Sequence, residues 1–176
     1  MIDRPERILG IDPGLRLTGY GCVELAPSGP AVVEAGVFRL VRGSGSPPPV
    51  ADRLVELADD LRDLIGRTRP DRAAVEGLFA HYRHPATAVV MAHARGVILL
   101  ELRRASIPVT ELKPAEVKKS MAAHGAASKA QIQQAVMHAL GLPAPPSPAD
   151  VADALAIALT ASARSDLADP ARTADP

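Results

Sequence analysis

Residues 7–24 read RILGIDPGLRLTGYGCVE, and this stretch decides how the chain begins to fold. Its opening run, RILGID, is apolar and rich in branched side chains, which is typical of a buried strand, and the following Pro-Gly pair ends that strand. Residues 18–25 and 31–40 carry further β-branched and aromatic residues on either side of a turn signal at 28–30. The sequence therefore predicts a three-stranded antiparallel meander.

Helical and extended patterns alternate through the rest of the chain. Apolar residues at helical spacing predict an amphipathic helix over 50–66, and a short strand follows at 72–76. Because a helix lies between them, this strand can return parallel to the first one by a right-handed crossover. An edge strand is expected at 107–111, where Pro108 cannot donate to a ladder. The other predicted helices span 86–105, 114–122, 128–140 and 147–163. This pattern predicts an α/β fold with a mixed five-stranded sheet flanked by helices.

Length and composition set the class of protein. The 176 residues, 47% of them hydrophobic, suit one domain with a full core, which we place at 1–163. Residues 164–176 are polar with two prolines and are expected to form a disordered tail. No apolar run approaches the roughly 20 residues of a membrane helix, and no signal peptide is recognisable, so a cytoplasmic protein is expected. Cys22 is the only cysteine, which excludes an intramolecular disulfide and a cysteine zinc site.

The net charge of zero hides a separation of charge along the chain. Segments 1–78, 79–140 and 141–176 carry net charges of −2, +5 and −3. All five histidines lie in the positive segment, but their spacings match no zinc pattern. A balanced total therefore excludes only binding driven by uniform charge, and an anionic partner remains possible.

Four carboxylates stand out at the ends of predicted elements. Asp12 ends the first strand, Glu76 ends the parallel strand, and Asp150 and Asp153 lie three residues apart at the start of the last helix. The carboxyl ends of neighbouring parallel strands lie on the same edge of a sheet, and residues three apart share one helix face. A helix docked on that edge would complete a cluster of four acids.

Such a cluster requires cations. Two like charges about 4 Å apart repel by about 4 kcal/mol at an effective dielectric of 20. Oxygen ligands of this kind suit Mg²⁺, for which Mn²⁺ could substitute, and two ions could clamp the attacking and leaving oxygens of a phosphodiester. The predicted chemistry is metal-assisted phosphodiester hydrolysis.

Each acid also has a simpler interpretation. Asp12 could start a turn before Pro-Gly, Glu76 could be a solvated strand end, and Asp150 could cap a helix. Asp153 is harder to explain in this way, because it precedes an almost wholly apolar run. The joint placement of the four acids favours the metal site.

Four motifs together resemble the RuvC family of Holliday junction resolvases. They are GIDPGLRLTGYGCVE (10–24), VEGLF (75–79), ARGV (94–97) and ADVADALAIAL (149–159). The resemblance implies a ribonuclease H-like fold, a homodimer, and a divalent-metal-dependent endonuclease that makes paired, symmetric nicks in a four-way DNA junction during recombination and repair. It also implies cooperation with the branch-migration proteins RuvA and RuvB.

The resemblance assigns roles to particular residues. It implies that the catalytic acids and metal ligands are Asp12, Glu76, Asp150 and Asp153. It places DNA-binding lysines at Lys118, within AEVKKS, and at Lys129, within ASKAQ. Lys119 is adjacent to Lys118 on a predicted helix, so the two cannot both face DNA.

Two of the four aromatic residues fall in the loop after Glu76. Phe79 and Tyr82 could stack on unpaired bases, and Arg83 beside them could contact a phosphate. Phe79 matches a family position, whereas Tyr82 does not. The alternatives are that the aromatic rings pack under the loop and that the basic residues form a solvated surface.

Two other functions compete with a junction-resolving nuclease. Asp12-Pro13-Gly14 and Thr18 imitate the phosphate-binding turn of actin- or sugar-kinase-like ATPases, although 176 residues cannot hold the two domains of that fold. A catalytically silent junction-binding protein is the other alternative. The intact set of four acids favours the nuclease.

Overall fold

Five strands form one mixed sheet in the order β3-β2-β1-β4-β5. The computed structural model describes residues 4–77, 85–122 and 127–168. Strands β1, β2 and β3 pair antiparallel, while β4 and β5 run parallel to β1. The strands are β1 (Glu6–Asp12), β2 (Leu17–Ala26), β3 (Gly29–Arg39), β4 (Arg72–Glu76) and β5 (Val109–Leu112). The predicted meander, parallel return and edge strand are confirmed.

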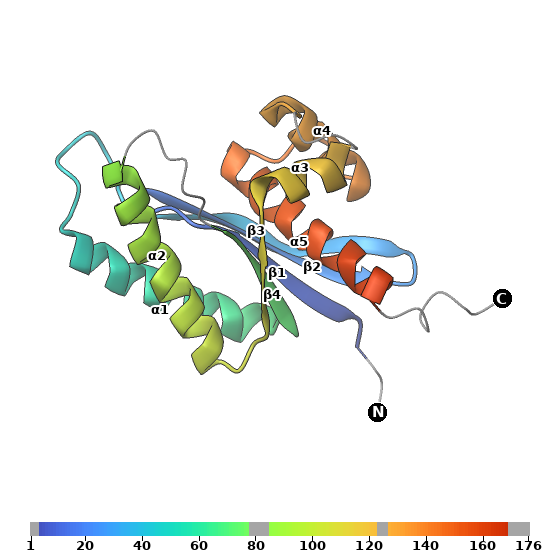
Figure 1. The fold of residues 1–176 in the computed structure, drawn as a ribbon, viewed down its shortest axis with the longest axis horizontal. Helices are drawn as coiled ribbons and strands as arrows, with labels where there is room; N and C mark the ends of the chain where they lie inside the picture. The colour runs from blue at the N-terminus through green and yellow to red at the C-terminus, as the bar shows by residue number, and fades with distance from the viewer. Residues whose placement is uncertain (1–3, 78–84, 123–126, 169–176) are drawn as a thin grey trace.

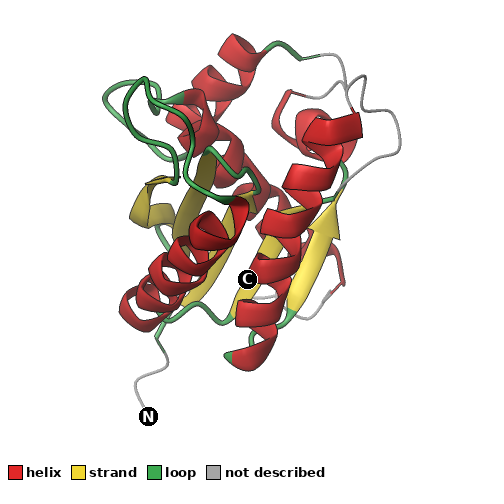
Figure 2. Ribbon diagram, turned by 90° about the vertical axis from the view of Figure 1, so that its left-hand side faces the viewer, coloured by secondary structure: helices red, strands yellow, loops and turns green. Residues whose placement is uncertain are grey.

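Helices cover both faces of the sheet. Figure 1 shows α1 and α2 below the sheet and α3, α4 and α5 above it. Figure 2, turned by 90°, shows the strands in yellow among the red helices. The helices are α1 (Val50–Thr68), α2 (Pro85–Arg104), α3 (Pro114–Ala122), α4 (Lys129–Ala139) and α5 (Ala149–Ala168). They match the predictions closely. Ser128 caps α4 by accepting a hydrogen bond from the Gln131 backbone N–H.

The last helix differs from its prediction at both ends. It begins at Ala149, two residues after the predicted start, and it extends to Ala168, beyond the predicted end near residue 163. The first residues of the predicted tail therefore continue α5. Residues 169–176 lie outside the described part of the chain.

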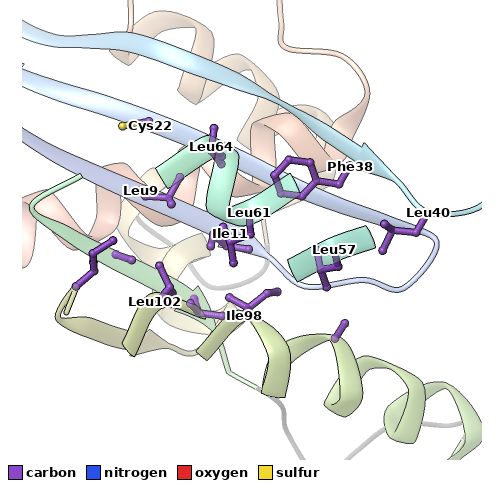
Figure 3. Close-up of a cluster of buried hydrophobic side chains, with 14 of the residues drawn as sticks. Leu9, Ile11, Cys22, Phe38, Leu40, Leu57, Leu61, Leu64, Ile98 and Leu102 are labelled. Carbon is purple, nitrogen blue, oxygen red and sulfur yellow. The ribbon is translucent and has the colours of Figure 1, made fainter. Parts of the chain in front are cut away.

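Alternation along the strands divides the core into two layers. Leu9 and Ile11 of β1 pack toward α1 and α2 with Leu57, Leu61 and other residues of the first layer, as Figure 3 shows. Ile8 packs on the opposite face in the second layer, against α3, α4 and α5. Because side chains alternate along a strand, β1 supplies both layers, which makes it the central strand of the fold.

Helix α5 lies directly on the sheet because small residues face each other across the contact. Residues 154–161 of this helix are buried and include four alanines. A Cβ atom built on Gly10 of β1 would lie 2.1 Å from the carbonyl oxygen of Ala154, which is closer than atoms can approach. Glycine at position 10 therefore sets the depth of α5 on the sheet.

Among the described residues, no helix is long and apolar enough to cross a membrane. Cys22 is buried in the first core layer as a free thiol, and burial raises its pKa to about 11. It therefore behaves as a small apolar side chain.

Candidate active site

Asp12 and Glu76 come together at the carboxyl ends of two adjacent parallel strands. The β1–β4 register pairs Gly10 with Ala74 and Ile11 with Val75, so the two acids follow as the next pair. Asp12 is two residues beyond Gly10, which faces α5, and Glu76 is two residues beyond Ala74, which packs in the same layer. Strand alternation therefore directs both carboxyl groups to the face that α5 covers.

The start of α5 brings the other two acids over this sheet edge. Asp150 and Asp153 lie in the first turns of the helix, and both act electrostatically on Asp12. Gly19, the β2 partner of Asp12, permits this approach, because a Cβ there would lie 2.2 Å from the Asp150 carbonyl oxygen. The predicted convergence of four acids from three elements is present.

Three of the acids share one cavity of about 300 Å³ with two lysines. It is lined by Asp12, Glu76, Pro114, Val117, Lys118, Lys129, Ile132, Asp153 and Ile157. Asp150 lies outside this lining and borders a second cavity that also contains Asp12. The site therefore combines carboxyl groups from β1, β4 and α5 with lysines from α3 and α4.

The environment makes ionisation of these acids unfavourable. The pKa of Asp12 is raised to about 8, chiefly by burial and also by repulsion from Glu76, Asp153 and Asp150. Burial also raises the pKa of Glu76, and that of Asp153 despite the nearby charge of Lys129. Asp12 and Glu76 are hydrogen-bonded to each other through their carboxyl groups, and this bond couples their titration.

Lys118 and Lys129, to which the family resemblance gives a role in DNA binding, both line the cavity that holds the acids. Lys129 Nζ forms an ion pair with Asp153 Oδ2 at 3.8 Å, and 77% of the Lys129 side chain is exposed. Lys118 and Lys119 are both exposed, but Lys118 lines the cavity and lowers the pKa of Glu76 and Asp153, whereas Lys119 is not part of the lining. Of the two adjacent lysines, Lys118 faces the acids.

The donor set fits a hard divalent cation. Three half-buried carboxyl groups with raised pKa values are the oxygen donors that Mg²⁺ and Mn²⁺ prefer, and a bound cation would offset their mutual repulsion. Within the described ranges, no three acid, histidine or cysteine side chains already stand in metal-holding geometry.

Three of the predicted DNA-contacting residues belong to the loop after Glu76. Phe79, Tyr82 and Arg83 lie outside the described residues. His93 of α2 is exposed and is absent from the lining of both cavities.

The resemblance to an ATPase turn has a different structural explanation. Thr18 is fully buried, and its hydroxyl donates to the Gly14 carbonyl and accepts from the Gly14 backbone N–H at 3.3 Å. This hydroxyl closes the β1–β2 turn and is not presented to a phosphate. The Asp-Pro-Gly sequence therefore shapes the turn that carries Asp12.

Sequence reasoning missed the residues that make the site geometry possible. Gly10 and Gly19 allow α5 to approach, and Val117, Ile132 and Ile157 form the apolar walls of the cavity. The signal in the sequence is the presence of glycine within the predicted strands, since glycine inside a strand often marks close backbone approach.

Comparison with known proteins places the chain in a family. The family model described as crossover junction endodeoxyribonuclease RuvC matches residues 8–161. Proteins of that name from Synechococcus sp. strain WH7803 and Prochlorococcus marinus strain MIT 9313 are 44% and 42% identical to this chain over 154 residues. In both, the match covers 88% of this chain and 96% of the relative.

Solved structures agree with this result. Thermus thermophilus RuvC superposes with a TM-score of 0.82 at 30% identity, covering 92% of this chain and 96% of the other. The same protein in complex with a Holliday junction substrate gives 0.84 at 30% identity, covering 93% and 96%. The fold is thus ribonuclease H-like, and the family relation decides against the ATPase alternative. The chain belongs to the RuvC family of crossover junction endodeoxyribonucleases, and is therefore a nuclease of the hydrolase class.

Proposed function

We propose that this chain resolves Holliday junctions by nicking two DNA strands symmetrically, in homologous recombination and DNA repair. The observation that supports this function best is the cavity in which Asp12, Glu76 and Asp153 face Lys118 and Lys129. An acidic wall opposite a basic wall suits a phosphodiester held by cations on one side and by ammonium groups on the other. A solved relative of this chain binds a Holliday junction substrate, which is consistent with the proposal.

The acids are proposed as the catalytic cation-binding residues. Nucleases of this family depend on divalent metal ions. We propose two ions per site, Mg²⁺ with Mn²⁺ able to substitute, held by Asp12, Glu76, Asp150 and Asp153. A bound ion supplies Lewis-acid polarisation of the scissile phosphate. Asp150 is assigned with the others because it acts on the charge of both Asp12 and Asp153.

The lysines are proposed to stabilise the phosphate during hydrolysis. Water forms a bond to phosphorus, the bond to the 3′ oxygen breaks, and the leaving oxygen receives a proton, which yields a 5′-phosphate and a 3′-hydroxyl. Lys129 reaches the cavity from α4 and Lys118 reaches it from α3, so both can approach the phosphate oxygens as negative charge develops. Phe79, Tyr82 and Arg83 remain proposed DNA contacts of the loop after Glu76.

The proposal includes assembly and location. Paired nicking requires two active sites, so we propose a homodimer of single nuclease domains spanning 1–163. Exposed apolar residues on α2, Val89 at 56% and Leu100 at 48%, support a surface for a second copy. Cooperation with RuvA and RuvB, and action in the cytoplasm where chromosomal DNA lies, belong to the same proposal.

A cleavage assay tests this function directly. The purified protein is incubated with synthetic four-way junctions and with linear duplexes of the same arms, with Mg²⁺, with Mn²⁺ and with a chelator, and nick positions are mapped on each strand. We expect paired nicks at symmetric positions in junctions only, and only with a divalent ion. Junction binding without nicking under every ion would favour the silent binding protein instead.

A further inference from the structure

A second cavity of about 640 Å³ adjoins the acid cluster, and no lysine is among the described residues that line it. It shares Asp12 with the first cavity, and we call it the Arg53 cavity. Its lining comes from the β1–β2 turn, from α1, from α2 and from the start of α5. The residues are Asp12, Pro13, Gly14, Leu15, Arg16, Leu17, Arg53, Val90, Met91 and Asp150. Its size is that of a site for a small organic group.

Arg53 is the unusual residue of this cavity. Its side chain is 8% exposed, and one guanidinium nitrogen, Nη1, donates to the Leu15 carbonyl oxygen at 2.8 Å. Its Nε is buried and has no hydrogen-bond partner. Among the described residues, no acid forms an ion pair with Arg53. A buried guanidinium with one carbonyl acceptor is poorly compensated, because buried charges are normally paired.

We propose that the Arg53 cavity binds the nucleotide of the cleaved strand that adjoins the scissile phosphate, with the phosphate of that nucleotide at Arg53. This inference rests on the proposed nuclease function. A strand whose scissile phosphate lies in the lysine-lined cavity must continue past Asp12, and the Arg53 cavity is the depression that shares Asp12 with it.

The lining suits a nucleotide better than a free anion. Leu15, Leu17, Val90 and Met91 provide apolar walls for a deoxyribose and the face of a base, while Arg53 provides a fork of donors for phosphate oxygens. Arg16, at the exposed rim, adds a second positive charge. Asp12 and Asp150 belong to the acid cluster, whose negative charge is offset by the divalent ions on which the family depends.

The experiment measures coupling between Arg53 and single phosphates. A series of synthetic four-way junctions is prepared. Each junction carries a single uncharged methylphosphonate at a different phosphate beside the nick, and the scissile phosphate is left unmodified. Cleavage rates and junction affinities are measured for the wild type and for Arg53→Met, which keeps an unbranched apolar stem and removes the guanidinium charge.

We expect a methylphosphonate at one position next to the scissile phosphate to lower the wild-type cleavage rate about tenfold, since a hydrogen-bonded negative charge is lost there. In Arg53→Met the same methylphosphonate should change the rate by less than about twofold, because the contact is already absent. Equal relative effects in both proteins at every position would overturn the proposal.

A second pair of variants covers the case in which Arg53→Met does not fold. Met91→Glu places a negative charge in the cavity wall, and Met91→Gln has a similar size without charge. We expect Met91→Glu to cleave about tenfold more slowly than Met91→Gln, and a methylphosphonate at the sensitive position to remove most of that difference. A difference that persists with every methylphosphonate contradicts a phosphate in this cavity.

The outcomes separate this inference from the proposed function. If the wild type nicks no junction, the nuclease proposal fails, and the same coupling is then read from junction affinity. If the wild type nicks junctions and no coupling is found, only the nucleotide site is wrong.

Discussion

The carboxyl groups of Asp12 and Glu76 are hydrogen-bonded to each other across the ends of two parallel strands. The pair shares a proton because burial and two further acids make four ionised groups unfavourable at this sheet edge. The same crowding that favours a proton favours a divalent cation. The protonation of Asp12 and the binding of a cation should therefore compete.

Stability should fall with rising pH when a chelator is present. Asp12 has a pKa of about 8 in the folded chain against an ordinary value of 3.8, so between these values the folded state holds a proton that the unfolded state has lost. Stability then decreases with pH by at most about 1.4 kcal/mol per unit for one such proton. Glu76 and Asp153 contribute with the same sign.

Denaturant titrations from pH 4 to pH 8 in a chelator measure this slope. Asp12→Asn should flatten it, because the amide cannot ionise. A wild-type stability that rises over this range would contradict the raised pKa of Asp12.

Removing one acid should abolish nicking and preserve junction binding. Asp12→Asn and Asp153→Asn each take a charged oxygen from the cation site, and we expect cleavage to fall about 100-fold or more. Junction affinity, measured by electrophoretic mobility shift, should stay within about threefold of the wild type, because the proposed phosphate contacts are lysines and not these acids. Asp63→Asn, an exposed acid on α1, is the matched control and should cleave normally. Retained cleavage in either site variant would remove these acids from the mechanism.

The adjacent lysines of α3 should differ in effect. Lys118 lines the cavity beside the acids, whereas Lys119 is exposed outside it. We expect Lys118→Ala to lower the single-turnover cleavage rate about tenfold, and Lys119→Ala to change it by less than about twofold. Because both variants lose one charge, their comparison separates position from net charge. Similar losses in the two would indicate a general electrostatic effect.

Adding one methyl group at the sheet–helix contact should disrupt the site from a distance. Gly10→Ala forces α5 away from β1, since its Cβ would lie 2.1 Å from the Ala154 carbonyl oxygen. We expect a loss of about 1–3 kcal/mol in the free energy of unfolding and a lower cleavage rate.

Gly66→Ala serves as the control for this change. Nothing lies within 4 Å of a Cβ at that position, on the exposed side of α1. Alanine there should stabilise the helix by about 0.5–1 kcal/mol without affecting cleavage. Equal effects of the two substitutions on thermal denaturation would contradict the role given to Gly10.

The sequence by itself determined the order of elements and the identity of the acids. The spacing of apolar residues distinguishes the strands of the β1–β3 meander from helix α1. The Pro-Gly pair after Asp12 marks the end of β1, so the sequence places a carboxylate at that strand end. These are local signals, because strand alternation and helical spacing depend on neighbours in the chain. The charge pattern also followed from the sequence, since acidic and basic segments alternate along it.

Only the tertiary structure decided how the acids are divided between two cavities. Asp153 faces the lysines while Asp150 borders the Arg53 cavity, although the two lie three residues apart on one helix. That division depends on the depth of α5 on the sheet, which Gly10 and Gly19 set through contacts with residues more than 100 positions away. Likewise, the buried, half-satisfied guanidinium of Arg53 arises from packing between α1 and the β1–β2 turn, and in the sequence it is one arginine of an ordinary amphipathic helix. Such contacts join residues that are far apart in the chain, so the periodic spacing of residues in the sequence does not predict them.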